Sequence, residues 1–257
     1  PKSAGTEQRD DVEFTVPTKK LAFETELVAI PLMTTIAESN KRSSINELME
    51  NEFQLAVMSP QALSYQFLTG LDAVYWTISD FSFSDKRVRS YEVSLVEPKD
   101  NHYALPHSLL TMTMLAVIVW DDVAPSDLSE DQQRAIIDWL YWGGQLVISG
   151  PTSWSRLQNS FISSYLPAFS ADSIELPTDA FAELSQTWIT KDLGKLNTTD
   201  AIEIIGPPVA GLKLNLSPNG TWLPGTGELV AEARVGRGRI VVTGFPLRDP
   251  RIYQWPY

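Results

Sequence analysis

The sequence predicts an α/β domain: a mostly parallel, open sheet flanked by helices, with a β-hairpin near the C-terminus. Residues 115–150 contain two apolar runs joined by a helical pattern, which is typical of parallel strands covered on both faces. Near the chain end, two β-prone runs surround Gly236 and Gly238, which indicates a hairpin turn. Because 43% of the 257 residues are hydrophobic, the chain can bury a sizeable core, and we expect a single domain over residues 1–257.

The first 100 residues predict a polar N-terminus followed by short strands. Residues 1–12 are polar and are expected to be frayed, while Ser39–Glu52 has helical spacing. Apolar or alternating runs predict the following strands: Glu13–Pro17, Leu27–Leu32, Phe53–Met58, Leu71–Trp76 and Tyr91–Val96.

The clearest pattern lies in the middle of the chain. A continuous apolar strand is expected at Leu115–Trp120 and a second at Gln145–Ser149. Between them, Ser129 and Gln132 form a capping-box pattern that begins a helix. One face of this helix is apolar through Ile136, Trp139 and Leu140, and Gly143 and Gly144 end it.

The pattern weakens after this unit and recovers at the end. Ser155–Phe169 predicts a helix interrupted by Pro167, and Gly206–Gly227 reads as irregular or short-stranded. Residues 151–225 are therefore expected to form an irregular insertion or subdomain. Glu228–Val235 and Arg239–Thr243 then predict the two strands of the hairpin.

Two of these segments resemble a known family. Asp121–Gly150, with Leu128, Ser129 and Gln132 before the helix and Gly143-Gly144 after it, resembles the core of class I glutamine amidotransferase-like domains. The similarity is greatest to their extracytoplasmic versions in bacterial membrane-associated proteins and to trehalose-utilisation-like domains. Val235–Phe245 resembles their closing hairpin, so the resemblance covers about 40 residues. It implies a flavodoxin-like scaffold and, by itself, no activity.

Composition excludes several chemistries. The chain has no cysteine, so the family's cysteine nucleophile, disulfides and cysteine-ligated metals cannot occur, and no Gly-x-Ser-x-Gly motif replaces that nucleophile. A net charge of −12 disfavours nucleic acid and anionic lipid as partners. No apolar run reaches the roughly 20 residues that span a bilayer. We expect no cofactor and no metal.

Polar residues at predicted strand ends are the candidate site. Asp121 and Asp122 follow one strand and could bind a cation or act as acid and base, or they could be loop and capping carboxylates. Ser149 ends the next strand, where open α/β sheets bind ligands, and could be a nucleophile, a ligand contact or a turn serine.

Two other features of the sequence each have a functional and a simpler interpretation. His107, or His102 five residues earlier, could serve as a base, although a loop histidine explains both. Arginines near the C-terminus could form a basic patch or could be solvated charges: Arg234, Arg237, Arg239, Arg248 and Arg251.

The functional expectation is a non-catalytic ligand- or protein-binding module. It would be the extracytoplasmic (periplasmic or cell-surface) domain of a larger membrane-associated protein, touching the membrane only through flanking segments. Its partner would be a protein or a small-molecule or carbohydrate ligand. The alternatives are a hydrolase or carbohydrate-active enzyme using Asp121, Asp122, Ser149 or His107, a structural scaffold, and a cytoplasmic location.

Overall fold

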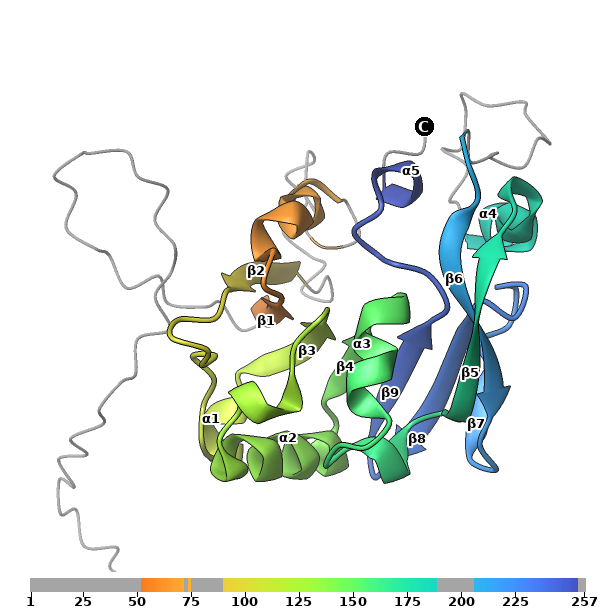
Figure 1. Cartoon of the computed structure of the whole chain (residues 1–257). Coiled ribbons are helices and arrows are strands. Elements are labelled where there is room, and N and C mark those ends of the chain that lie inside the picture. Colours follow the sequence, from red (N-terminus) through yellow and green to blue (C-terminus); the bar gives the residue numbers. More distant parts are fainter. Residues whose placement is uncertain (1–51, 72–73, 75–89, 189–205, 254–257) are drawn as a thin grey trace, which may run out of the picture.

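A seven-stranded sheet forms the centre of the computed structural model, which describes residues 52–71, 74, 90–188 and 206–253 (Figure 1). Its strands lie in the order β2-β1-β3-β4-β9-β8-β7. The first five are parallel and the last two antiparallel, which confirms the predicted mostly parallel sheet. The strands are β1 (Glu52–Met58), β2 (Ser90–Val96), β3 (Leu115–Trp120), β4 (Gln145–Ile148), β7 (Gly220–Trp222), β8 (Val230–Val235) and β9 (Gly238–Thr243).

The order of the parallel strands locates the sheet's switch point. Counted among themselves, the five parallel strands follow the flavodoxin-like order 2-1-3-4-5. The chain moves outward in one direction from β1 to β2 and in the other direction from β3 onward. In sheets of this order, ligands bind outside the carboxyl ends of the strands where the direction reverses, here between β1 and β3.

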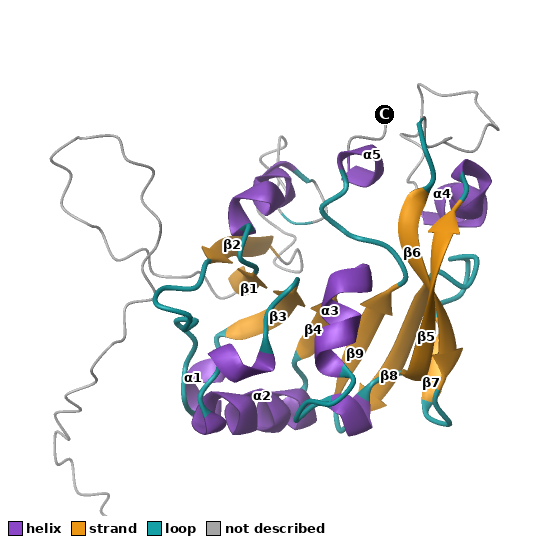
Figure 2. Ribbon diagram, in the orientation of Figure 1, coloured by secondary structure: helices purple, strands orange, loops and turns teal. Residues whose placement is uncertain are grey.

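Alternate residues of the parallel strands pack on opposite faces. Ile118 and Trp120 face α2 (Glu130–Trp142) and α3 (Gly150–Leu157), which lie on the same side of the sheet (Figure 2). Val117 and Val119 belong to the other face, where Tyr65 of the 3-10 helix η1 (Ala62–Gly70) packs. This period of two, with both faces covered, explains why the strands read as continuous apolar runs.

Helix α2 has the predicted beginning, face and end. The Ser129 hydroxyl accepts a hydrogen bond from the Gln132 amide, and the Gln132 side chain accepts one from the Ser129 amide. Trp139 is buried and its indole N–H donates to the Leu115 carbonyl at 2.8 Å. Gly143 ends the helix with a φ of +125°, a conformation that disfavours any residue with a Cβ.

The region after β4 differs from the sequence expectation. The helix expected at Ser155–Phe169 is wrong: α3 begins at Gly150, with Pro151 in the first turn, where its missing N–H costs no hydrogen bond. After a short turn of 3-10 helix, η3 (Ser163–Tyr165), the chain enters β5 (Ala168–Leu176).

Strand β5 pairs with a later strand to form a separate sheet. Its antiparallel partner is β6 (Val209–Leu216), so Gly206–Gly227 holds an eight-residue strand as well as the short β7. The remaining elements are α1 (Leu109–Met112), η2 (Pro125–Asp127), η4 (Thr178–Phe181), α4 (Ala182–Trp188) and α5 (Pro250–Tyr253).

The N-terminal expectations are only partly covered by the described residues. The strand at Phe53–Met58 is confirmed as β1. The strand at Leu71–Trp76 is wrong at its two described residues, because the Val74 amide donates to the Leu71 carbonyl in a turn. The expectations for residues 1–12, 13–17, 27–32 and most of 39–52 lie outside the described residues.

Candidate functional site at the carboxyl edge of the sheet

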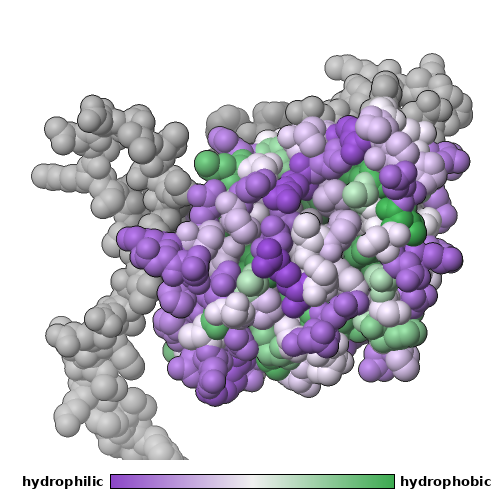
Figure 3. Space-filling view, viewed as in Figure 1, coloured by the Kyte–Doolittle hydropathy of each residue, from purple (hydrophilic) through white to green (hydrophobic). Residues whose placement is uncertain are grey.

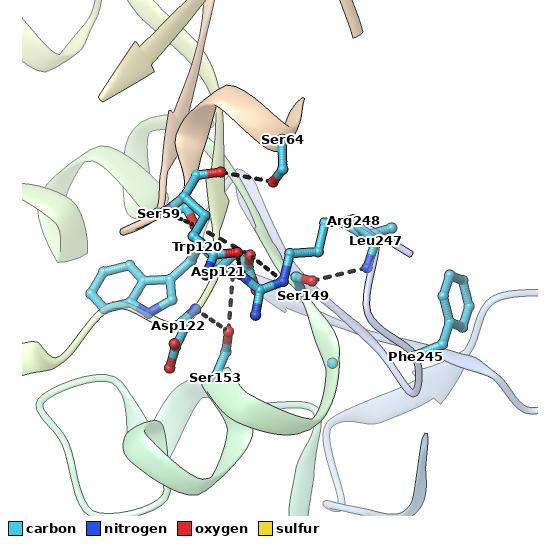
Figure 4. Close-up of polar contacts among 12 residues, drawn as sticks. Ser59, Ser64, Trp120, Asp121, Asp122, Ser149, Ser153, Phe245, Leu247 and Arg248 are labelled. Carbon is cyan, nitrogen blue, oxygen red and sulfur yellow. Dashed lines mark hydrogen bonds and ion pairs between the residues drawn. The ribbon is translucent and has the colours of Figure 1, made fainter. Parts of the chain in front are cut away.

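The parallel strands bring three polar residues to one edge of the sheet. Asp121 continues the ladder of β3 because its amide donates to the Met58 carbonyl at 2.9 Å. Ser149 continues β4 in the same way, through the Trp120 carbonyl at 2.9 Å. Ser59, Asp121 and Ser149 therefore follow neighbouring strands at the carboxyl edge (Figure 4).

Asp121 is buried and incompletely hydrogen-bonded. Only 1% of the residue is exposed, so the carboxylate of Asp121 is enclosed by the protein. Its Oδ2 accepts a 3.3 Å hydrogen bond from the Ser59 hydroxyl and lies 3.6 Å from Arg248 Nε. Its Oδ1 has no hydrogen-bond partner within the described ranges. A carboxylate can accept about four hydrogen bonds, so most of this capacity is unused.

Tyr65 brings a second unpaired polar atom to the same place. It lies on η1 and is 1% exposed. Its hydroxyl is near Asp121 and Ser149 but makes no hydrogen bond of good geometry with any residue that the structure describes. Burial raises the pKa of Tyr65 far above its ordinary value, and the negative charge of Asp121 raises it further. The hydroxyl therefore stays protonated and able to donate.

Burial also controls the charge of Asp121. Desolvation raises the pKa of its carboxyl above the ordinary 3.8, while Arg248 and the neighbouring hydroxyl groups act in the opposite direction. We call Ser59, Tyr65, Asp121, Ser149 and Arg248 the switch-point cluster, because they surround the carboxyl ends of β1, β3 and β4.

Arg248 reaches the cluster from the segment after β9. Its side chain is 24% exposed, and its Nη1 donates to the Gln61 side chain at 2.9 Å. The preceding residue, Leu247, donates its amide hydrogen to the Ser149 hydroxyl oxygen at 3.0 Å. Residues that follow β1 and β4 thus contact the same short segment.

Asp122 belongs to a different set of contacts. Its φ is +56°, and its amide donates to the Ser153 hydroxyl at 2.8 Å. The carboxylate pairs with Arg156 at 2.8 Å and points away from Asp121 (Figure 4). The two adjacent carboxylates therefore do not converge as an acid–base pair.

Ser149 is not arranged as an activated nucleophile. The residue is fully buried, stands immediately before α3, and its hydroxyl oxygen accepts from the Leu247 amide. His102 and His107 lie in the exposed loop before α1, and neither forms a hydrogen bond with Ser149. The base that a serine nucleophile needs is not supplied by either histidine.

The C-terminal arginines do not form one patch. Arg239 on β9 pairs with Glu232 and hydrogen-bonds Gln145. Arg248 and Arg251 follow the other end of that strand, where Arg251 pairs with Asp249 at 2.6 Å. Gly236 forms the predicted hairpin turn with a φ of +60°. Across the described ranges, no group of three or more acidic or histidine side chains is placed to hold a metal.

Sequence reasoning found Asp121 and Ser149 but missed Ser59, Tyr65 and the role of Arg248. Strand-end position was the useful signal for the first two. Ser59 carries the same signal at the end of β1, whereas Tyr65 and Arg248 reach the cluster only through tertiary contacts.

Comparison with known proteins supports the fold alone. Neither a protein-family model nor a curated sequence matches the chain. A cytoplasmic protein from Salmonella typhimurium LT2 has a similar structure, with a TM-score of 0.50, 14% identity, and coverage of 79% of this chain and 94% of its own. A second cytoplasmic protein from Salmonella typhimurium has a TM-score of 0.50 and 11% identity, with coverage of 79% of this chain and 93% of its own. An exo-β-1,4-mannosidase from Opitutaceae bacterium strain TAV5 gives a TM-score of 0.37, with 14% identity and coverage of 79% of this chain and 32% of its own, and carries no argument about function.

Proposed function

We propose that the chain is a non-catalytic binding module whose ligand contacts Asp121 in the switch-point cluster. The observation that carries this proposal is the buried carboxylate of Asp121, whose Oδ1 makes no hydrogen bond within the described ranges. The neighbouring Tyr65 hydroxyl is close enough to affect the pKa of Asp121 but is not in hydrogen-bonding geometry. A buried acceptor without a donor costs roughly 1–3 kcal/mol, and a ligand that brings donors would recover this free energy. The position, between β1 and β3, is where sheets of this order bind ligands.

The geometry favours binding over catalysis. Of the four candidate residues, Asp121 and Ser149 meet in the switch-point cluster, whereas Asp122 pairs with Arg156 and His107 lies in the exposed loop before α1. Neither histidine is therefore placed to act as a base for Ser149. General acid–base and nucleophilic catalysis both need such groups within hydrogen-bond reach of one substrate. The hydrolase alternative therefore has no support from the arrangement of these side chains.

We also propose the family and location that the sequence resemblance implies. The chain would be a class I glutamine amidotransferase-like domain without its nucleophile, held outside the cytoplasm by a membrane-associated parent protein. No helix in the described part of the chain is long and apolar enough to cross a membrane. Fractionation of cells expressing the tagged parent protein tests the location: recovery with the membranes and access to external protease support it, and recovery in the cytosol contradicts it.

Thermal unfolding in the presence of small polar compounds tests the binding proposal. Suitable probes are agmatine, glucose and citrate, which represent cationic, neutral and anionic ligands. We expect at least one to raise the melting temperature by about 2–4 °C at saturating concentration. Asp121→Asn should abolish this rise and the control Asp122→Asn should retain it. A rise that survives in Asp121→Asn, or none with any probe, contradicts the proposal.

A further inference from the structure

The segment Phe245–Asp249 crosses the carboxyl edge as a strap. It follows β9 and continues toward α5, close to η1 (Figure 1; Figure 4). Leu247 is bound to Ser149 through its amide and packs against two apolar clusters, one with Phe181 and Phe245 and one with Tyr65 and Val119. Beyond the strap, the ring of Tyr253 stacks on Phe67 of η1 with centroids 4.1 Å apart. The strap therefore covers the ends of β4 and β1.

A glycine allows the strap to lie directly on the start of α3. A Cβ added to Gly150 would stand 2.3 Å from the carbonyl carbon of Phe245 and 2.8 Å from the nitrogen of Pro246. Backbone atoms cannot move aside as a flexible side chain can. The strap can therefore lie against α3 only because residue 150, which follows Ser149, has no side chain.

Arg248 occupies the position opposite Asp121 but does not satisfy it. Its Nε lies 3.6 Å from Oδ2, whereas a charged N–H···O bond is about 2.7–2.9 Å long. Part of its guanidinium is used by Gln61, and Oδ1 receives no donor from any described residue. An arginine with freer geometry could offer two parallel N–H groups to the same carboxylate.

We propose that Asp121 binds a guanidinium group and that the side chain of Arg248 occupies this binding position in the absence of ligand. The external ligand then carries a guanidinium group that replaces Arg248; this inference rests on the proposed function. The planar fork of such a group matches a carboxylate with one empty oxygen. The Ser59 hydroxyl, which donates to Oδ2, remains to hold Asp121 in place.

Access to Asp121 requires the strap to move. Asp121 is 1% exposed, while the Arg248 side chain is 24% exposed and can swing into solvent. The net charge of −12 concentrates cations around the protein. Because the closed strap competes with the ligand, the apparent affinity is reduced by the fraction of molecules that are open.

Chemical rescue of Arg248→Ala tests this inference. Ethylguanidine should bind the vacated position and raise the melting temperature of Arg248→Ala by about 2–4 °C in a saturable manner. The wild type should need about tenfold more ethylguanidine for the same rise, because Arg248 competes. Ethylurea, an uncharged isostere, should have no such effect. Arg248→Gln carries the same test if Arg248→Ala does not fold.

Two further variants show whether the rescue occurs at Asp121. The double variant Asp121→Asn with Arg248→Ala should not be stabilised by ethylguanidine, since it lacks the carboxylate that binds the guanidinium group. Arg156→Ala removes the guanidinium that pairs with neighbouring Asp122, and ethylguanidine should not raise the melting temperature of this variant. Absence of rescue in both Arg248 variants, or equal rescue in the double variant, overturns the inference.

The two proposals can fail separately. If glucose or citrate stabilises the wild type through Asp121 while ethylguanidine leaves both Arg248 variants unchanged, the binding module stands and the guanidinium ligand is wrong. Ethylguanidine could instead rescue Arg248→Ala while none of the three probes, agmatine included, stabilises the wild type. This result would support the guanidinium-binding position on Asp121 and contradict the proposal that the wild-type protein is a binding module.

Discussion

At the scale of single residues, two adjacent aspartates differ because their backbone turns them apart. Asp121 continues the strand and its carboxylate enters the protein, whereas Asp122 adopts a left-handed conformation and pairs with Arg156 near the surface. An exposed pair of this kind stabilises by about 0–1 kcal/mol. A buried carboxylate with one oxygen left without a donor is destabilising, and such a cost at a strand end is typical of a binding residue.

Asp121→Asn should change how stability depends on pH. The raised pKa means that the folded state keeps a proton that the unfolded chain releases above its ordinary 3.8. The contribution of Asp121 to the stability of the wild type is therefore lost as pH rises from 3.8 through the folded pKa, and the variant lacks this contribution. Arginine stays charged and the pKa of Tyr65 is raised, so Asp121 alone changes charge within the cluster.

Urea unfolding between about pH 4 and pH 8 measures this difference. The free energy of unfolding of Asp121→Asn, relative to wild type, should increase with pH and then level off. A difference that stays constant over the range would show that the carboxyl of Asp121 titrates alike in the folded and unfolded states.

Ser149 should support no glutamine hydrolysis. Amide hydrolysis needs a nucleophile with a base in reach and donors aimed at the developing oxyanion. The Ser149 hydroxyl is buried and bound to the Leu247 amide, and the chain has no cysteine. Ammonia release from glutamine by the purified protein should equal background. Turnover that disappears in Ser149→Ala would replace the binding module by the hydrolase alternative.

At the scale of elements, α2 shows what local sequence can determine. Its cap, apolar face and stop all depend on residues within the helix or beside it, and all three were predicted. Strand β5, by contrast, is stabilised by residues far away in the sequence, because it pairs with β6 about 40 residues later. The sequence predicted an irregular insertion or subdomain over residues 151–225, because local spacing carries no signal of this non-local pairing.

Two tryptophans in α2 provide a matched test of its packing. Trp139 is buried on the sheet and hydrogen-bonded to Leu115, whereas Trp142 is 66% exposed at the end of the same helix. Trp139→Ala should lower the free energy of unfolding by about 3–5 kcal/mol, and Trp142→Ala by about 0.5 kcal/mol or less. Chemical denaturation measures both, and similar losses would show that the helix face is assigned wrongly.

At the scale of the whole molecule, the two edges of the sheet differ in chemistry. The carboxyl edge carries the switch-point cluster, while four exposed apolar side chains lie toward the amino edge, around the starts of β3 and β4: Leu110, Met114, Tyr141 and Trp142. Leu63 of η1 and Phe169 of β5 are exposed elsewhere. Figure 3 shows apolar residues of the viewed face in small separate patches among hydrophilic ones. This distribution favours a polar ligand at one edge over a broad scaffolding surface.

The sequence predicted the sheet better than the site. Apolar runs fixed β3 and β4 and indicated that they are parallel neighbours, which the pairing of Ile118 with Leu146 confirms. Strand-end position pointed to Asp121 and Ser149. It could not show that Tyr65 and Arg248, 56 and 127 residues away from Asp121, complete the cluster, because only the tertiary fold brings them together.

The most direct test of the carboxyl-edge site is a map of ligand-induced shifts in backbone ¹H–¹⁵N NMR spectra. The wild type would be titrated in turn with agmatine, glucose and citrate. The account predicts that shifts concentrate at Ser59, Asp121, Ser149 and Leu247 for any compound that binds, and that these shifts vanish in Asp121→Asn. Shifts concentrated instead at the amino edge, around Trp142, Gly143 and Arg237, would contradict it.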